Sequence, residues 1–190
     1  MESLNPLYLN KNHGATILAK HVPFRGIDLD TLTLIYSYGE IVQVAAHSNV
    51  IVEGESSAGM YVLLEGLAGV YKSESSSRKG TLIKTLTQGE AFGEMSLIDR
   101  APRSATVSAE VNAVLFFLSA EAWDRTIQSD PQIGMKLYQN FALDMSRRLR
   151  AMNDDLIVSQ RQLWRMTFVR ALSADLKGDL EDQPADAGHA

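Results

Sequence analysis

The chain has 190 residues, 45% of them hydrophobic and 22% charged, a composition typical of one globular domain with an appendage. It contains no cysteine, which excludes a disulfide framework and thiolate metal sites, and its net charge of −5 argues against a broad nucleic-acid-binding surface. No apolar run approaches the length of a membrane span, and residues 1–20 lack the pattern of a signal peptide, so we expect a cytoplasmic protein without membrane contact.

The N-terminal part of the sequence predicts an arm followed by one helix. Residues 1–20 are of mixed composition with a proline and a glycine, and we expect them to be loosely attached. Asp28 or Asp30 is placed to cap a helix over residues 28–37, because a short acidic side chain accepts hydrogen bonds from the first free N–H groups of a helix.

From residue 39 onward the sequence changes to short apolar runs separated by turn clusters. The runs are rich in β-branched and aromatic residues, which favour strands. They cover residues 41–44, 50–52, 60–64, 67–71, 81–86, 105–111 and 114–118. The polar residues 74–80 predict a hairpin tip. The fold class is therefore mainly β with flanking helices, an antiparallel jelly-roll-like β-roll followed by a long C-terminal dimerisation helix.

Helical periodicity returns after residue 118. Ser119 predicts the start of one helix, and Asp130 with Pro131 predicts the start of a long one. Apolar residues then recur every three or four positions, at Tyr138, Phe141, Met145, Leu149, Met152, Leu156, Leu163 and Met166, with Ser159 as the polar exception. This spacing is typical of a coiled-coil seam and predicts a homodimer.

These patterns divide the chain into four parts. They are an N-terminal arm at residues 1–20, a β-roll with flanking helices at 21–130, a long helix for dimerisation and ligand covering at 131–177, and an acidic disordered tail at 178–190.

Residues 92–107, with the sequence FGEMSLIDRAPRSATV, combine opposite charges with a possible helix start. Glu94 and Arg103 are nine residues apart in a segment too compact to be a strand. The guanidinium of Arg103 and free backbone N–H groups near residues 95–97 would hold a small anion, and Glu94 would accept a hydrogen bond from a hydroxyl of the same ligand. A phosphate joined to a sugar is the simplest such ligand. The alternative is a surface arginine paired with Glu94 or Asp99.

This stretch resembles the phosphate-binding cassette of cyclic nucleotide-binding domains. The spacing from Glu94 to Arg103, with Pro102 before the arginine, resembles regulatory subunits of cAMP-dependent protein kinase, whereas Ser104 resembles the bacterial catabolite activators. The resemblance covers about residues 22–160 and implies the β-roll. Many members have Gly-Asp where this chain has Ser57-Ala58, in a loop that we expect to lie away from the phosphate.

The resemblance also implies roles for individual residues. Arg103 would bind the cyclic phosphate, Glu94 the ribose 2′-hydroxyl, and Gly93 would let the backbone approach the sugar. Ser96 would offer a backbone N–H to the phosphate. The predicted ligand-binding set also includes Phe92, Met95, Ser104, Ala105, Met152 and Asn153.

The resemblance leaves the preferred base open. Serine at position 104 is compatible with cAMP and with cGMP, and we favour cAMP because the bacterial activators also carry serine there. Met152 and Asn153 align with hydroxyl residues that contact adenine in those activators. Asn153 has the donor and acceptor to pair with a base edge, but Met152 could only pack against it. The alternative for both residues is that they are simply part of the coiled coil and do not contact a base.

The predicted function is a cyclic nucleotide receptor that signals through its C-terminal helix to an unidentified effector protein. The four histidines are scattered and no catalytic constellation is visible, so we expect no enzyme, no metal and no cofactor besides the ligand. One alternative is a truncated or atypical DNA-binding regulator of the activator family, but few residues follow Leu163 and they end acidic, so DNA is not an expected partner. A cupin-like metalloenzyme would need clustered histidines, and only His47 lies in the roll. A degenerate domain without ligand is the last alternative, and the intact Glu94 and Arg103 argue against it.

Overall fold

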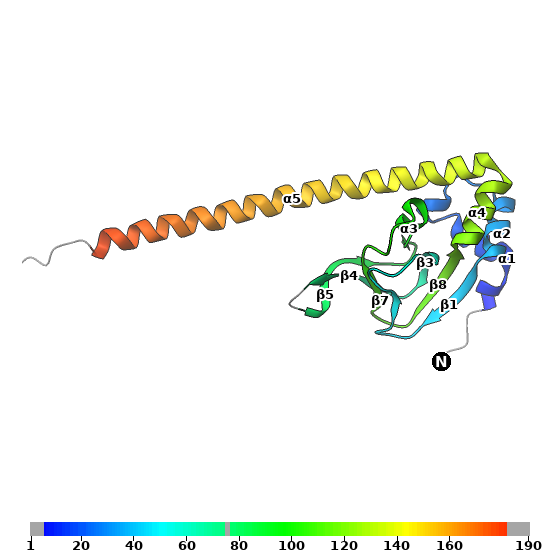
Figure 1. The fold of residues 1–190 in the computed structure, drawn as a ribbon, viewed down its shortest axis with the longest axis horizontal. Helices are drawn as coiled ribbons and strands as arrows, with labels where there is room; N and C mark the ends of the chain where they lie inside the picture. The colour runs from blue at the N-terminus through cyan, green and yellow to red at the C-terminus, as the bar shows by residue number, and fades with distance from the viewer. Residues whose placement is uncertain (1–5, 75–76, 182–190) are drawn as a thin grey trace, which may run out of the picture. The chain divides into compact units, whose positions relative to one another are not determined.

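The chain folds around two four-stranded antiparallel sheets, as shown by a computed structural model that describes residues 6–74 and 77–181 (Figure 1). One sheet has the order β1 (Glu40–Val44), β8 (Ala113–Ser119), β3 (Gly59–Glu65) and β6 (Ala91–Phe92). The other has the order β2 (Asn49–Ile51), β7 (Thr106–Ala109), β4 (Ala68–Glu74) and β5 (Ser77–Leu86). The predicted antiparallel β-roll is confirmed. The predicted hairpin tip is shorter than expected, because β5 already begins at Ser77.

The central strands β3 and β8 are apolar on both faces, which explains why their sequences read as continuous apolar runs. Successive side chains of a strand point to opposite faces. In β3, Met60, Val62 and Leu64 belong to the core under the helices, whereas Leu63 belongs to the core between the sheets. Each fully buried side chain of this size stabilises the fold by about 1.5–3 kcal/mol, so β3 is a rigid base for the residues that precede and follow it.

Short helices cover one end of the roll (Figure 1). They are η1 (Pro6–Leu9), α1 (Lys11–Leu18), η2 (Val22–Phe24), α2 (Leu29–Tyr38) and α4 (Ala120–Ser129). The predicted caps are confirmed: the Asp28 side chain accepts from the N–H of Thr31 at 2.9 Å, and Ser119 Oγ accepts from the N–H of Ala122 at 3.1 Å.

From Tyr8 onward the N-terminal arm is packed into the core, in contrast to the expected loose attachment. Ala15 and Leu18 are fully buried, and the hydroxyl of Tyr36 donates to the carbonyl of Tyr8 at 2.7 Å. Gly14 lies so close to the Tyr36 ring that an added Cβ would approach it to 2.1 Å. The arm is held by these contacts, which involve residues far apart in the sequence.

The long helix α5 runs from Pro131 to Glu181, with the predicted start at Asp130, whose Oδ1 accepts from the N–H of Gln132 at 2.8 Å. It therefore continues past residue 177, and residues 182–190 of the predicted tail lie outside the described part of the chain. The chain divides into two units, Met1–Asp144 and Met145–Ala190. Within the first unit Phe141 is 2% exposed and packs against Trp123, so it belongs to the core and not to a seam. Across the described residues, no helix is apolar enough over a sufficient length to span a bilayer.

Candidate functional site

Arg103 is buried, with only 4% of its surface exposed, in the segment that leads into β7. Its Nη1 donates to the carbonyl of Gly93 at 2.9 Å, and its Nη2 donates to the carbonyl of Gly59 at 2.6 Å. Its own backbone is fixed as well, because the N–H of Arg103 donates to Glu55 at 2.8 Å and its carbonyl accepts from Gly54 at 2.9 Å. The alternative of a surface arginine is therefore wrong.

The electrostatic environment of Arg103 is that of a cation removed from water. Burial lowers the pKa of Arg103, while the neighbouring Tyr61, Glu94 and Glu55 act in the opposite direction. Arginine nevertheless stays charged in proteins. The acceptors of its two side-chain hydrogen bonds to Gly93 and Gly59 are neutral carbonyl groups. An anion placed against the guanidinium would stabilise this buried charge further.

Gly93 makes the close approach of the guanidinium possible. Its φ is +79°, a conformation that side-chain-bearing residues rarely adopt. An added Cβ would lie 2.6 Å from Nη1 of Arg103 and 3.3 Å from the carbonyl oxygen of Gly59. The glycine is thus required by the arginine itself, in addition to any approach of the backbone to a sugar.

Glu94 is 3% exposed and directly precedes α3 (Met95–Asp99). Its carbonyl accepts from the N–H groups of Leu97 and Ile98 at 3.0 and 3.3 Å. Because α3 begins at Met95, the N–H groups of Met95 and Ser96 have no acceptor within the helix. Ser96 is buried and Met95 is 48% exposed. The predicted helix start, the carboxylate and Arg103 are therefore brought together in the first unit.

Phe92 joins the site to the core through a stacked pair of rings. It lies opposite Tyr61 in the β3–β6 pairing, and the two ring centroids are 5.3 Å apart. Burial raises the pKa of Tyr61, and the charge of Arg103 acts against that shift. The sequence did not predict that Tyr61 and Gly59 lie beside Arg103. Both residues belong to β3, about 40 positions earlier in the chain, and only the folding of the sheet brings them close to the arginine.

Ser104 and Ala105 follow the arginine and differ in exposure. Ser104 is exposed, and its carbonyl accepts from Nζ of Lys72 at 2.7 Å, whereas Ala105 is 9% exposed. Lys72 was not predicted to lie at the site. The loop with Ser57-Ala58 was expected to be remote from it, yet Gly54 and Glu55 of that loop hold the backbone of Arg103.

Comparison with known proteins agrees with this geometry. Residues 41–130 match the family model described as a cyclic nucleotide-binding domain. This part of the chain belongs to the cyclic nucleotide-binding domain family. The match includes both glycines, the carboxylate and the arginine of the site, together with every strand from β2 to β8.

Three similar proteins align with more of this chain than residues 41–130. Human cGMP-dependent protein kinase 2 is 28% identical over 148 residues, which are 77% of this chain but 19% of the kinase. The catabolite activator protein of Thermus thermophilus is 25% identical with a TM-score of 0.62, covering 72% of this chain and 62% of that one. A cyclic nucleotide-binding domain from Methylobacillus flagellatus has a TM-score of 0.67 at 19% identity, covering 82% and 96%.

The remaining two predicted ligand residues, Met152 and Asn153, lie outside the first unit and outside the matched residues 41–130. Met152 and Asn153 are exposed residues of α5 in the second unit. Their contact with a base stays a prediction. Among the described residues no group of three histidine, aspartate or glutamate side chains is placed to hold a metal ion.

Proposed function

We propose that the chain is a receptor for a cyclic nucleotide, with cAMP favoured over cGMP, and that it has no catalytic role. The observation that carries this proposal is the buried Arg103, which lies beside the buried Glu94 and donates to two neutral carbonyl groups. Burial of a guanidinium is costly, and a charged partner in addition to Glu94 and Glu55 would offset more of that cost. A cyclic phosphate is such a partner.

The proposed binding mode uses the groups already placed around Arg103. The phosphate oxygens accept from the guanidinium and from the N–H groups of Met95 and Ser96 at the start of α3. The carboxylate of Glu94 accepts from the ribose 2′-hydroxyl. Phe92 and Ala105 form apolar walls, and Ser104 contributes a polar group at the edge.

The preference for cAMP rests on Ser104, and cGMP is the competing ligand because Met152 and Asn153 replace the hydroxyl residues that contact adenine in the activators. The relative named for cGMP covers most of this chain, which makes the comparison of the two bases worth a direct test. An asparagine amide has one donor side and one acceptor side and would select a base through its edge.

The proposed output is a homodimer that passes the ligand signal to an effector protein in the cytoplasm. In the second unit, Leu149, Met152, Leu156 and Leu163 are 57–66% exposed and follow the three- and four-residue steps of a coiled-coil seam. We expect the helix to adopt two alternative positions. Ligand binding would shift the balance between them only if the ligand binds one state of the chain more tightly than the other.

Calorimetric titration with cAMP, cGMP and 5′-AMP tests the proposal. We expect one cyclic nucleotide per chain, tighter binding of cAMP than of cGMP, and no measurable binding of 5′-AMP, whose phosphate is not cyclic. Absence of binding of both cyclic nucleotides to folded protein would contradict the receptor function. Tighter binding of cGMP would contradict only the base preference.

A further inference from the structure

The pairing of β4 with β7 stops next to the site, and an ion pair takes its place. The two strands pair in one register from Ala68 opposite Ala109 to Tyr71 opposite Thr106. Continued in that register, Ser73 would face Ser104. Their backbone groups bond elsewhere: the N–H of Ser73 donates to Oε2 of Glu53 at 2.8 Å, and the carbonyl of Ser104 accepts from Nζ of Lys72 at 2.7 Å.

Glu53 and Lys72 also bond to each other. The N–H of Ser73, the Glu53 carboxylate, the Lys72 ammonium group and the carbonyl of Ser104 therefore form one chain of hydrogen bonds. Nζ of Lys72 also donates to Oε1 of Glu53 at 2.6 Å. The hydrogen bond from Lys72 and that from the N–H of Ser73 lower the pKa of Glu53 to about 2, which keeps its carboxylate charged at neutral pH. The N–H of Glu53 donates in turn to Oγ1 of Thr106 at 3.0 Å.

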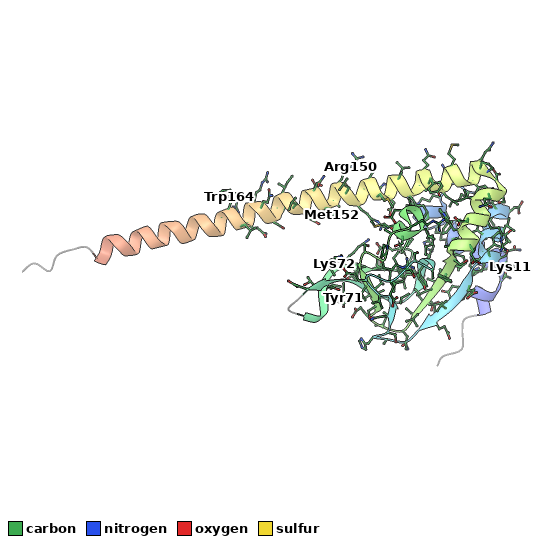
Figure 2. The ribbon with its side chains drawn as sticks, in the orientation of Figure 1. Lys11, Tyr71, Lys72, Arg150, Met152 and Trp164 are labelled. Carbon is green, nitrogen blue, oxygen red and sulfur yellow. The ribbon has the colours of Figure 1, made fainter. Side chains whose placement is uncertain are left out.

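The backbone of β4 is shaped to aim Lys72 at this position. The β4–β5 pairing shifts register between Val70 and Tyr71 and again between Lys72 and Glu74. Such irregularities re-aim a side chain and increase the local twist of a strand. Across from them, Gly80 has a φ of +78°, and an added Cβ there would lie 2.4 Å from the carbonyl oxygen of Lys72. Figure 2 labels Tyr71 and Lys72, which are neighbours on β4.

We propose that the Glu53–Lys72 pair positions the phosphate-binding segment. The two side chains hydrogen-bond to the N–H of Ser73 and the carbonyl of Ser104, which would otherwise be free to pair with each other as β4 pairs with β7. The pair thereby sets the distance between the sheet and the segment of Arg103 and Ser104. This inference rests on the proposed function, because positioning matters only if that segment binds the ligand.

Stability of the fold is a weaker explanation for the pair. The side chain of Lys72 is 52% exposed and that of Glu53 is 22% exposed, and exposed ion pairs contribute little to stability. Glu53, however, directly precedes Gly54 and Glu55 in the chain, and these two residues hydrogen-bond to the carbonyl and the N–H of Arg103. Displacing Glu53 would therefore displace the backbone that holds the arginine.

Three variants test the positioning role. Lys72→Met removes both donated hydrogen bonds while keeping the length of the side chain, and Lys72→Arg keeps a donor. We expect Lys72→Met to weaken cAMP binding about tenfold, the cost of losing a charge-assisted hydrogen bond, and Lys72→Arg to recover most of that loss. The matched control is Lys84→Met. Lys84 lies on β5, the strand next to β4, and the substitution removes its 2.7 Å ion pair with Glu90.

A second readout needs no nucleotide. Hydrogen exchange at the N–H groups of Gly54 and Arg103 should be faster in Lys72→Met than in Lys84→Met, because those bonds depend on the position of Glu53. If wild-type protein binds no cyclic nucleotide, the proposed function fails and the exchange rates alone decide the positioning role. Equal exchange rates and, where nucleotide binds, equal affinities in Lys72→Met and Lys84→Met would overturn the inference.

Discussion

A Cβ on Gly93 would lie 2.6 Å from Nη1 of Arg103, so the guanidinium occupies the space that any other residue at position 93 would need. The backbone turn and the buried cation are therefore one feature of the site. The positive φ of Gly93 and the hydrogen bond from Nη1 to its carbonyl both depend on the absence of a side chain.

We expect Gly93→Ala to weaken both the fold and the nucleotide binding. The strained φ alone costs about 1–3 kcal/mol, and the clash with Arg103 adds displacement of the guanidinium. The control is Gly26→Ala, outside the site, where φ is +72° and an added Cβ would meet only the end of the Lys136 side chain, at 3.1 Å. Denaturant unfolding should show a similar strain cost in both variants, whereas calorimetry should show a clear loss of affinity only in Gly93→Ala. Equal affinities in the two variants would refute the steric coupling.

His21 should make stability depend on pH near neutrality. Burial, and to a smaller extent the charge of Lys20, lowers the pKa of His21 below 6.5. The unfolded chain therefore binds more protons than the folded chain just below pH 6.5, and the free energy of unfolding falls as the pH decreases from there through the folded-state pKa.

Urea unfolding at pH 7.5 and 5.5 measures this effect. The difference between the two pH values should be smaller in His21→Gln, which cannot titrate, than in the wild type. His47→Asn serves as the control, because His47 is exposed and asparagine tolerates its φ of +64°. That variant should keep the wild-type pH dependence. An unchanged pH dependence in His21→Gln would show that another group is responsible.

The exposed apolar residues of the second unit should form the dimer seam. Figure 2 labels Met152 in this helix, and its side chain is 66% exposed. Replacing Leu156 by serine removes a seam residue, and we expect sedimentation to show a dimer in the wild type and a shift toward monomer in Leu156→Ser. Asp154→Ser, two residues away and outside the apolar spacing, should stay dimeric. A monomeric wild type would contradict the proposed assembly.

Much of the fold could be predicted from the sequence, because the decisive signals are local. The caps Asp28, Ser119 and Asp130 each act on N–H groups two or three residues away, and the apolar runs of β3 and β8 mark central strands directly. The proximity of Glu94 and Arg103 could also be predicted, because the cassette between them is one continuous stretch.

The parts that were missed depend on contacts between distant residues. Gly54 and Glu55 bond the backbone of Arg103 from about 50 positions away, and Lys72 reaches Ser104 from another strand. A turn cluster or a lysine in a strand gives no local signal of such a role. The packing of the N-terminal arm was missed for the same reason, since Ala15 and Leu18 are buried by elements that follow later in the chain.

The most direct test of the central claim is a calorimetric titration of two lysine variants with cAMP. Lysine keeps the charge but cannot form the two-pronged contact of a guanidinium. We expect Arg103→Lys to lose about a hundredfold in affinity, as two charge-assisted hydrogen bonds are weakened. Arg100→Lys, which changes an exposed arginine of the same cassette paired with Asp124, should bind as the wild type does. Wild-type affinity in a folded Arg103→Lys variant would contradict the assignment of Arg103 to the cyclic phosphate.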